Sequence, residues 1–332
     1  MGHPQVYVDG ILVHWGDRLF YEPVRGRRAP RAARVQWAGR AARASAMRAQ
    51  IDRTLRKVPE VMVKITNRPG TRNGMAAIRS HLEYVSRNGE VELEDQDGES
   101  IAGWHDVQDL ARMWRHAGRG IAEESERREA FNVMLSMPPG TDRAAVKAAA
   151  REFAREEFGG KHDYVFAAHN DENHPHVHLV VLARGRDGRR LNPRKADLQR
   201  WRERFAHELR EHGVEANATP RRTRGVTQRY ERQSIRQMRE RGVTPRARPA
   251  APDARATFEA HLPTMTAWRA TAEVLASSSD VSDQRMAREI TDFVREMPVA
   301  VGARGIDKRD VVPQAGKKPS GHRRRGVPDA ER

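Results

Sequence analysis

Cysteine is absent from the 332 residues of the sequence, which excludes disulfide bonds and thiolate metal ligands. No apolar run approaches the ~20 residues of a membrane span, and the residues after Met1 lack the apolar core of a secretory signal. Hydrophobic residues make up only 38% of the chain, so we expect parts of it to be extended or disordered. These absences predict a cytoplasmic protein without membrane insertion.

Positive charge is abundant. Lysine and arginine number 61 against 45 acidic residues, which gives a formal net charge of +16. A balance of this kind favours a polyanionic partner. Nucleic acid is the better candidate than a membrane surface, because no basic segment is accompanied by a strongly apolar face.

Histidines are concentrated between residues 169 and 178, where four of them fall within ten positions. If Pro175 opens a strand, His176 and His178 project from the same face, because strand side chains alternate. His169 ends the preceding apolar run and adds a third imidazole. This density predicts a metal site, whereas the alternative is a set of surface or packed histidines.

The segment His176-Val177-His178 resembles the His-hydrophobe-His core of the HUH endonucleases. The longer pattern from His169 through Asp171 and His174 to His178 is similar to the third motif of conjugative relaxases, of the MOB-P type that includes Ti-plasmid border nucleases. The resemblance covers residues 61–225, about half of the chain. It implies that a tyrosine lies upstream, in a helix near the start of the same domain.

Tyr84 is the tyrosine that fits this expectation. Met75, Ile78, Leu82 and Val85 recur at helical spacing, and at ~100° per residue Tyr84 falls on the opposite side. On the helical pattern alone, without the resemblance, we would interpret Tyr84 as an ordinary half-exposed tyrosine. However, residues 81–89 resemble the first relaxase motif, whose tyrosine attacks the scissile phosphate. An isolated phenol has a pKa near ~10 and needs a base, and Asp171, His174 and a hydroxide held by the metal stay open as that base.

The resemblance implies strand-specific DNA nicking at an origin of transfer, a 5′-phosphotyrosine link, and rejoining of the strand during conjugation. It implies His169, His176 and His178 as ligands of Mg²⁺ or Mn²⁺, while three nitrogen ligands also suit Zn²⁺. The implied partners are single-stranded DNA, accessory relaxosome proteins and a type IV secretion coupling protein, with export of the protein on the transferred strand. Basic residues in turns and helix ends are expected to hold DNA phosphates: Arg87, Arg190, Arg194, Lys195, Arg221, Arg222 and Arg224.

Strand patterns alternate with amphipathic helices, which predicts an α+β fold with a largely antiparallel sheet and flanking helices. The resemblance implies the five-stranded HUH relaxase sheet. The expected divisions are a flexible basic N-terminal arm (1–60), a relaxase domain (61–225), a charged helix and linker (226–252), a small helical segment (253–298) and a basic disordered tail (299–332). We weigh the arm both as a solvated segment and as a phosphate contact, and the tail as an export signal.

Three other functions are compatible with the same residues. The first is a hydrolase with a metal bound by three histidines, in which Tyr84 has no role. The second is a non-catalytic accessory protein that binds DNA. The third is an HUH replication initiator or transposase, although the helix of Tyr84 precedes the metal motif here and usually follows it in initiators.

Overall fold

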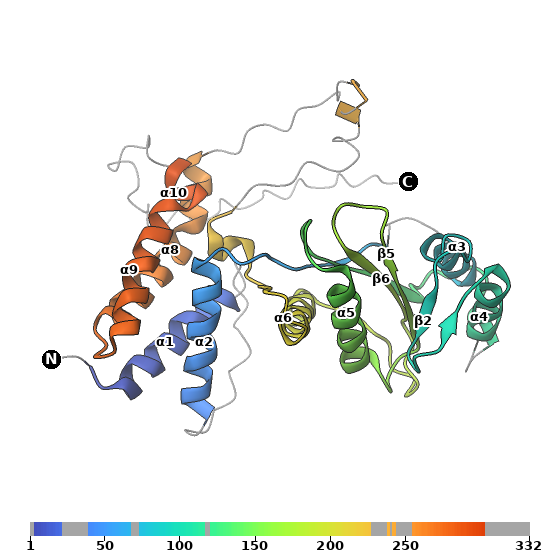
Figure 1. The fold of residues 1–332 in the computed structure, drawn as a ribbon, viewed down its shortest axis with the longest axis horizontal. Coiled ribbons are helices and arrows are strands. Elements are labelled where there is room, and N and C mark those ends of the chain that lie inside the picture. Colours follow the sequence, from blue (N-terminus) through green and yellow to red (C-terminus); the bar gives the residue numbers. More distant parts are fainter. Residues whose placement is uncertain are drawn as a thin grey trace, which may run out of the picture.

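The computed structural model describes residues 3–21, 39–67, 73–116, 120–226, 238–239, 241–243 and 254–302. These residues form two units that lie side by side (Figure 1). We call them the sheet unit, which runs from β1 to α6, and the helical unit, which combines helices from both ends of the chain.

The sheet unit is built on a six-stranded sheet in which every described pairing is antiparallel. The strand order is β1-β4-β6-β5-β2-β3, so the two histidine-bearing strands β5 and β6 lie in the middle. The α+β prediction is confirmed. The elements are β1 (Met62–Ile65), α3 (Met75–Val85), β2 (Leu93–Asp95), β3 (Ser100–Ile101), α4 (Trp104–His116), β4 (Ala130–Ser136), α5 (Arg143–Phe158), β5 (Tyr164–His169), β6 (His176–Leu182) and α6 (Lys195–Glu211).

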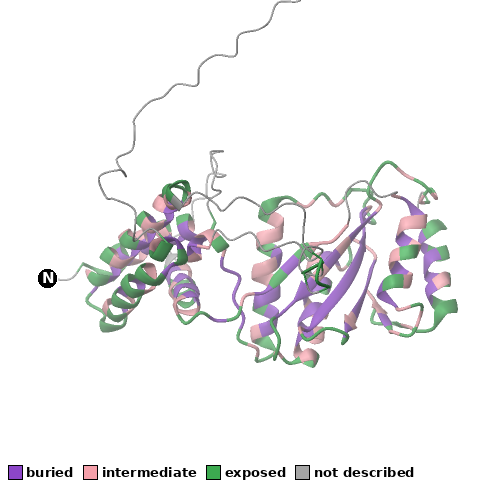
Figure 2. Cartoon of the chain, turned by 90° about the horizontal axis from the view of Figure 1, so that it is seen from above, coloured by how far each residue is buried: buried purple, intermediate pink, exposed green. Residues whose placement is uncertain are grey.

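Each face of the sheet is covered by a pair of helices. Alternate residues of β6, such as Val177 and Leu179, pack with α5 and α6 in one core, while Val180 and Leu182 pack with α3 and α4 in another. The central strands are buried and the outer faces of the helices are exposed (Figure 2). The predicted alternation of β6 is therefore confirmed, and it turns His176 and His178 towards α3.

The sheet has six strands, where the resemblance implied five. The acidic segment 90–99 forms the β2–β3 hairpin, and β2 pairs with β5 through Glu94 opposite Phe166. Arg151 on α5 forms an ion pair with Glu94. This pair offsets the charge of a carboxylate on β2, between β5 and the edge strand β3.

The helical unit contains the two N-terminal helices and the last three helices: α1 (Gln5–Phe20), α2 (Arg40–Leu55), α8 (Ala254–Ala276), α9 (Val281–Glu296) and α10 (Pro298–Gly302). Their buried side chains form one core, in which Trp268 meets Phe20 edge to face with ring centroids 6.2 Å apart. Gly16 allows α1 and α2 to approach closely, because a Cβ there would lie 2.2 Å from the sulfur of Met47.

The prediction of one flexible arm over residues 1–60 was wrong for both helices that the structure describes there. Helix α1 buries Val8, Leu12 and Leu19 against helices from the other end of the chain, a partner that local pattern does not reveal. Helix α2 occupies Arg40–Leu55 of the same expected arm, and α8 and α9 lie within the segment 253–298 that was expected to be helical. Residues 299–302, assigned to the disordered tail, instead belong to α10, where Val299 is buried.

The two units are joined where the chain enters and leaves the sheet unit. Asn217 donates its backbone N–H to the carbonyl of Pro59 and accepts one from Val61, at 2.8 and 2.9 Å. Beside it, the hydroxyls of Thr54 and Thr219 lie 2.9 Å apart. A short helix, η2 (Arg221–Arg224), follows, and the carbonyl of its Thr223 accepts a 2.8 Å hydrogen bond from Trp268 Nε1.

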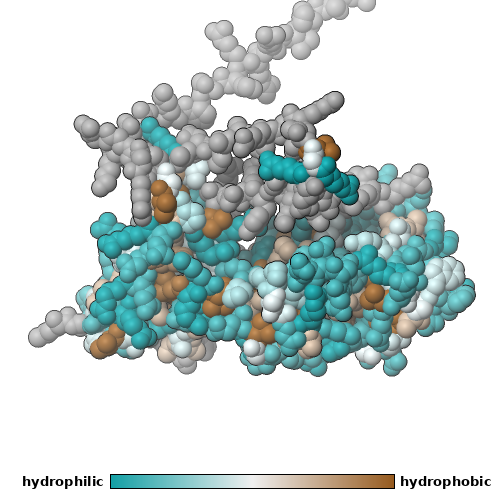
Figure 3. All heavy atoms as spheres, turned by 45° about the horizontal axis from the view of Figure 1, so that its top comes forward, coloured by the Kyte–Doolittle hydropathy of each residue, from teal (hydrophilic) through white to brown (hydrophobic). Residues whose placement is uncertain are grey.

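Most of the predicted linker and tail, including 227–237, 244–253 and 303–332, lie outside the described residues, as do Arg25, Arg27 and the rest of 22–38. Hydrophilic side chains dominate the surface seen in Figure 3. Among the described helices, none combines the length and apolar character needed to span a bilayer.

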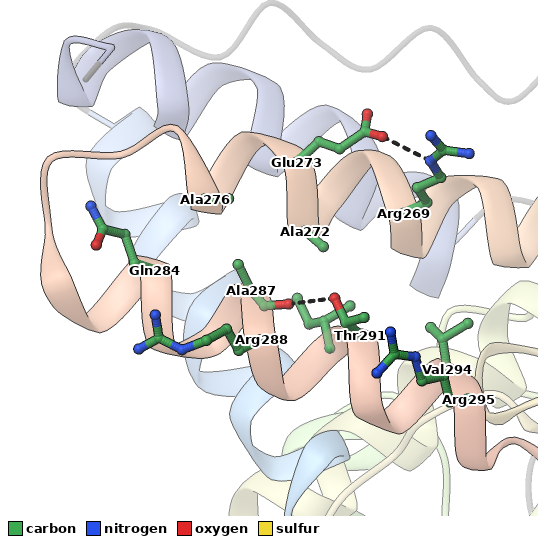
Figure 4. Close-up of a pocket in the computed structure, with 11 residues that line it drawn as sticks. Arg269, Ala272, Glu273, Ala276, Gln284, Ala287, Arg288, Thr291, Val294 and Arg295 are labelled. Atoms are coloured by element: carbon green, nitrogen blue, oxygen red, sulfur yellow. Dashed lines mark hydrogen bonds and ion pairs between the residues drawn. The ribbon is translucent and has the colours of Figure 1, made fainter. Parts of the chain in front are cut away.

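The helical unit carries a shallow groove of about 710 Å³ between α8 and α9, on whose floor lie the small side chains Ala272, Ala276 and Ala287 (Figure 4). None of the clustered histidines lines it. The candidate chemistry is therefore in the sheet unit.

Candidate metal and nucleophile site

Three buried imidazoles converge at one end of the central strands. His169 is the last residue of β5 and pairs directly with His176, the first residue of β6, while His178 follows two positions later on the same face. One ligand nitrogen from each lies within 4.8 Å of the others. The predicted set is thus brought together by strand register alone.

Hydrogen bonds determine which nitrogens are available for a cation. His169 Nε2 lies 2.7 Å from the carbonyl oxygen of Val85, so this nitrogen carries the proton and donates it. Its Nδ1 is buried and has no partner among the described residues. Likewise His176 Nδ1 lies 3.2 Å from the carbonyl of His174, which leaves Nε2. Carbonyl partners that fix the imidazole tautomer are usual around metal ligands, and the donor set fits a divalent ion.

Burial keeps the imidazoles of His169 and His178 neutral. Desolvation, reinforced by the neighbouring His169 and His176, lowers the pKa of His178 to about 3. Desolvation also lowers the pKa of His169, against the opposing effect of its hydrogen bond to Val85. A neutral imidazole has the lone pair that a cation needs, so the cluster is prepared for binding.

Tyr84 lies beside the cluster, on the last turn of α3. Its side chain is 52% exposed, as the helical pattern predicts, and its ring centroid is 5.9 Å from that of His178 in an edge-on arrangement. His81, one turn earlier, stacks on Tyr84 with centroids 5.8 Å apart. Desolvation and the nearby His169 lower the pKa of His81 to about 4. The accessible phenol of Tyr84 therefore lies near both the neutral imidazole of His81 and the ring of His178, and the centroids of those two rings are themselves 6.5 Å apart.

Arg87 and Asp171 close the site on the exposed side. The Arg87 guanidinium lies over the Tyr84 ring, 5.2 Å from its centroid, and forms an ion pair with Asp171. Asp171 also lies 3.7 Å from His176 Nε2. Partial desolvation alone would raise the pKa of Asp171, but Arg87 and a backbone hydrogen bond outweigh it and lower the value. Asp171 is consequently a carboxylate that links Arg87 to His176.

Arg143 is a site residue that the sequence analysis missed. From the first turn of α5 it donates hydrogen bonds to the backbone carbonyls of His169, at 3.2 Å, and of Glu172. It also reaches the side-chain oxygen of Asn170, at 3.4 Å. The guanidinium thus clamps the loop between β5 and β6. No local signal marks it, because its partners lie 26 or more residues away and two of them are backbone carbonyls.

His174 contributes its carbonyl to His176, and the centroids of the two rings are 5.3 Å apart. Of the seven basic residues expected to contact DNA, the structure brings only Arg87 to the histidines. Arg190 lies past the other end of β6, paired with Glu129, and Arg224 is paired with Glu60 beside the helical unit. Arg194 and Lys195 lie exposed at the start of α6, and Arg221 and Arg222 lie in η2. Contacts of these residues with DNA stay predictions.

Residues 84–214 match the family model described as relaxase, MobA/VirD2-like, nuclease domain. The T-DNA border endonuclease VirD2 of Rhizobium radiobacter is 31% identical over 188 residues, which are 51% of this chain and 44% of that protein. The VirD2 protein of Agrobacterium fabrum is 31% identical over 207 residues, 54% of this chain and 46% of that one. The chain therefore spans less than half the length of these relatives.

A solved structure described as "Molecular Basis of Vancomycin Resistance Transfer in Staphylococcus aureus" aligns with 49% of this chain and 98% of that one, at 16% identity and a TM-score of 0.33. A score of this size supports no inference about the fold.

Proposed function

We propose, from the premise that residues 84–214 carry a relaxase nuclease domain of the MobA/VirD2-like type, that this chain nicks one DNA strand at a border or origin of transfer. Attack by Tyr84 would leave a 5′-phosphotyrosine link that later allows rejoining. The observation that carries the proposal is the accessible phenol of Tyr84 with its ring centroid 5.9 Å from that of His178.

His169, His176 and His178 are the proposed ligands, with Mg²⁺ or Mn²⁺ as the expected ion and Zn²⁺ as an alternative. A divalent cation bound there would neutralise the non-bridging oxygens of the scissile phosphate. Burial of the three imidazoles, and the carbonyl partners of two of them, support this role.

Tyr84 is the proposed nucleophile. Its oxygen forms a bond to phosphorus, the bond from phosphorus to the 3′ oxygen breaks, and that oxygen leaves as a hydroxyl after gaining a proton. Arg87, over the phenol ring, is placed to stabilise negative charge on the phenolate and on the phosphate. Because the ester is conserved in the protein-bound strand, the free 3′-hydroxyl can reverse the reaction.

Asp171 and His174 are the proposed acceptors of the phenolic proton. The lowered pKa of Asp171 makes it a weak base. We therefore assign to Asp171 mainly the holding of Arg87 and His176, and keep His174 as the other candidate for the acceptor.

The decisive experiment incubates the full chain with single-stranded oligonucleotides from the transfer origin of its own mobile element, in the presence of Mn²⁺. We expect a denaturant-resistant adduct whose DNA-linked peptide contains Tyr84. Cleavage that persists in Tyr84→Phe would instead indicate a metal hydrolase. DNA binding that is insensitive to chelators, without nicking, would indicate an accessory protein, and adduct formation only at replication or transposition ends would indicate the third alternative.

The wider assignments rest on the same premise. We propose single-stranded DNA as the substrate, with accessory relaxosome proteins and a type IV coupling protein as partners and cytoplasmic action before export. We also propose that the DNA-processing domain spans residues 61–225, so that it includes β1 and all of α3.

A further inference from the structure

We propose that the indole of Trp104 is a stacking platform for an unpaired base next to the phosphate that Tyr84 attacks. The inference rests on the proposed function, because it requires a single strand in the site. It adds to the phosphate chemistry a residue that contacts a nucleobase.

The first observation is exposure. Trp104 is 52% exposed, whereas Trp114, at the other end of the same helix, is only 2% exposed. An indole in water forgoes the large gain that burial of its ring would give. Helix α4 already has an apolar face formed by Val107, Leu110 and Trp114, so packing of the helix does not require Trp104.

The second observation is position. Helices α3 and α4 lie side by side (Figure 1) and run in opposite directions. Gln108, early in α4, donates a 2.9 Å hydrogen bond to Glu83 near the end of α3. Ala122, after the end of α4, accepts a hydrogen bond from Met75 at the start of α3. Trp104, in the first turn of α4, therefore lies beside the end of α3 that carries Tyr84.

The contact that fixes this position is close. Gly103 donates its N–H to the carbonyl of Gly89 at 3.0 Å. Gly89 has φ +93°, and a Cβ there would lie 2.3 Å from the backbone nitrogen of Trp104. The turn after Tyr84 and the first residue of α4 are thus in van der Waals contact, with a glycine needed for both the backbone conformation and the space.

The third observation is the chemistry of the neighbours. Arg87 belongs to the turn that contacts Trp104, and it lies over Tyr84. Proteins that hold single strands combine cationic groups for phosphates with aromatic rings for bases. His105 meets the Trp104 ring edge-on, with centroids 5.2 Å apart. A single perpendicular ring can cover at most one face of the indole, and Trp104 is still 52% exposed.

The occupant that fits is therefore an unpaired nucleobase. Stacking accepts any base, because every base has a π face, so Trp104 would add affinity near the scissile phosphate without selecting the sequence. Selection of the site would then come from other residues.

The test uses the full chain carrying Tyr84→Phe, so that no covalent product forms. The probe is a short oligodeoxythymidylate with a single 2-aminopurine, moved one position at a time along the strand. We expect binding to quench the 2-aminopurine fluorescence at one position. Trp104→Ala should abolish that quenching, and the dissociation constant of the probe for this variant should rise about 5- to 100-fold. Trp104→Phe should keep the quenching and most of the affinity.

Met113→Ala is the matched control, because Met113 is 57% exposed on the same helix, about two turns from the end that contacts Gly89. It should bind the probe like the parent. Equal quenching and affinity in Trp104→Ala and the parent would overturn the inference while leaving the proposed nicking intact. Trp104-dependent quenching, together with failure of the parent chain with Tyr84 to nick any strand, would support stacking on Trp104 and refute the proposed function. Failure of the chain to bind any single strand would refute both.

Discussion

His169 donates its Nε2 proton to the backbone carbonyl of Val85, over 2.7 Å, and Val85 is the residue that follows Tyr84. The bond joins the end of a central strand to the end of the helix that carries Tyr84, the proposed nucleophile. It fixes both the nitrogen that faces a cation and the height of the tyrosine above the sheet. Cation site and phenol are therefore positioned by one contact, and disturbing either element disturbs both.

Tyr84→Phe should eliminate the covalent DNA adduct and leave DNA binding nearly unchanged. Only the phenolic oxygen is removed, and a side chain that is 52% exposed contributes little to the core. The measurement is adduct yield on a denaturing gel, with affinity from anisotropy. Tyr7→Phe is the matched control, because Tyr7 is also 52% exposed but lies on α1. An adduct formed by Tyr84→Phe would disprove the assignment.

His178→Ala should weaken Mn²⁺ binding strongly. Loss of an outer-sphere partner of a metal site typically weakens binding about 10–100-fold, and the loss of His178 should exceed that. The imidazole is one of the three proposed ligands, whose nitrogens lie within 4.8 Å of one another, and two nitrogens hold a cation poorly. Isothermal titration calorimetry measures the affinity, and EDTA should abolish nicking by the parent chain. His207→Ala is the control, since His207 lies exposed on α6 and pairs loosely with Glu211. Unchanged Mn²⁺ affinity in His178→Ala would remove this histidine from the ligand set.

Arg143→Ala should lower Mn²⁺ affinity about 10–100-fold with little change in melting temperature. The guanidinium restrains the backbone of His169 and Glu172, so its loss releases the loop that sets the ligands. Arg143→Lys should recover only part of the affinity, because an ammonium group cannot reproduce the planar fork. Arg155→Ala, an exposed residue of the same helix paired with Glu152, should bind Mn²⁺ normally. Equal affinity in all three variants would show that Arg143 plays no positioning role.

Asp283→Asn should destabilise the helical unit by roughly 3 kcal/mol. The buried Asp283 carboxylate accepts two hydrogen bonds from Arg48, at 2.7 and 2.9 Å. The amide removes this charged partner and leaves Arg48 paired, among the described residues, with Asp9 alone. Thermal unfolding followed by circular dichroism measures the effect. Asp292→Asn, in an exposed pair with Arg295 on the same helix, should change stability by less than about 1 kcal/mol.

The same pair predicts the response of the helical unit to acid. Desolvation would raise the pKa of Asp283, but the hydrogen bonds from Arg48 and Ser278 prevail and lower it. The carboxylate therefore contributes stability that is fully present above the unfolded value near ~3.9 and is lost as the pH falls through the lower folded value. Melting temperatures below about pH 4 should fall more steeply in the parent than in Asp283→Asn. Parallel curves would show that this carboxylate does not control the acid transition.

Sequence reasoning worked where the signal was local. The alternation of a strand places His176 and His178 on one face, and helical spacing places Tyr84 opposite the buried stripe of α3. It failed where the partner is distant. Helix α1 is stabilised by α8, from the other end of the chain, and Arg143 acts on backbone carbonyls that carry no sequence signature. Arg190 was expected to hold DNA phosphates because it is basic, but it lies past the end of β6 that is opposite to the histidines. Basic composition alone does not distinguish the two ends of a strand.

The pairing of Asn217 with Pro59 and Val61 has a consequence for biosynthesis. The sheet unit is an insertion between two halves of the helical unit, so a ribosome finishes the catalytic half before α8 to α10 exist. Leu12 and Phe20 of α1 pack with α8 in the finished protein. During that interval α8 does not yet cover these two side chains. Truncated chains that stop after α6 would keep those apolar side chains exposed, and a fragment restricted to residues 84–214 would lose β1 and nearly all of the helix that presents Tyr84.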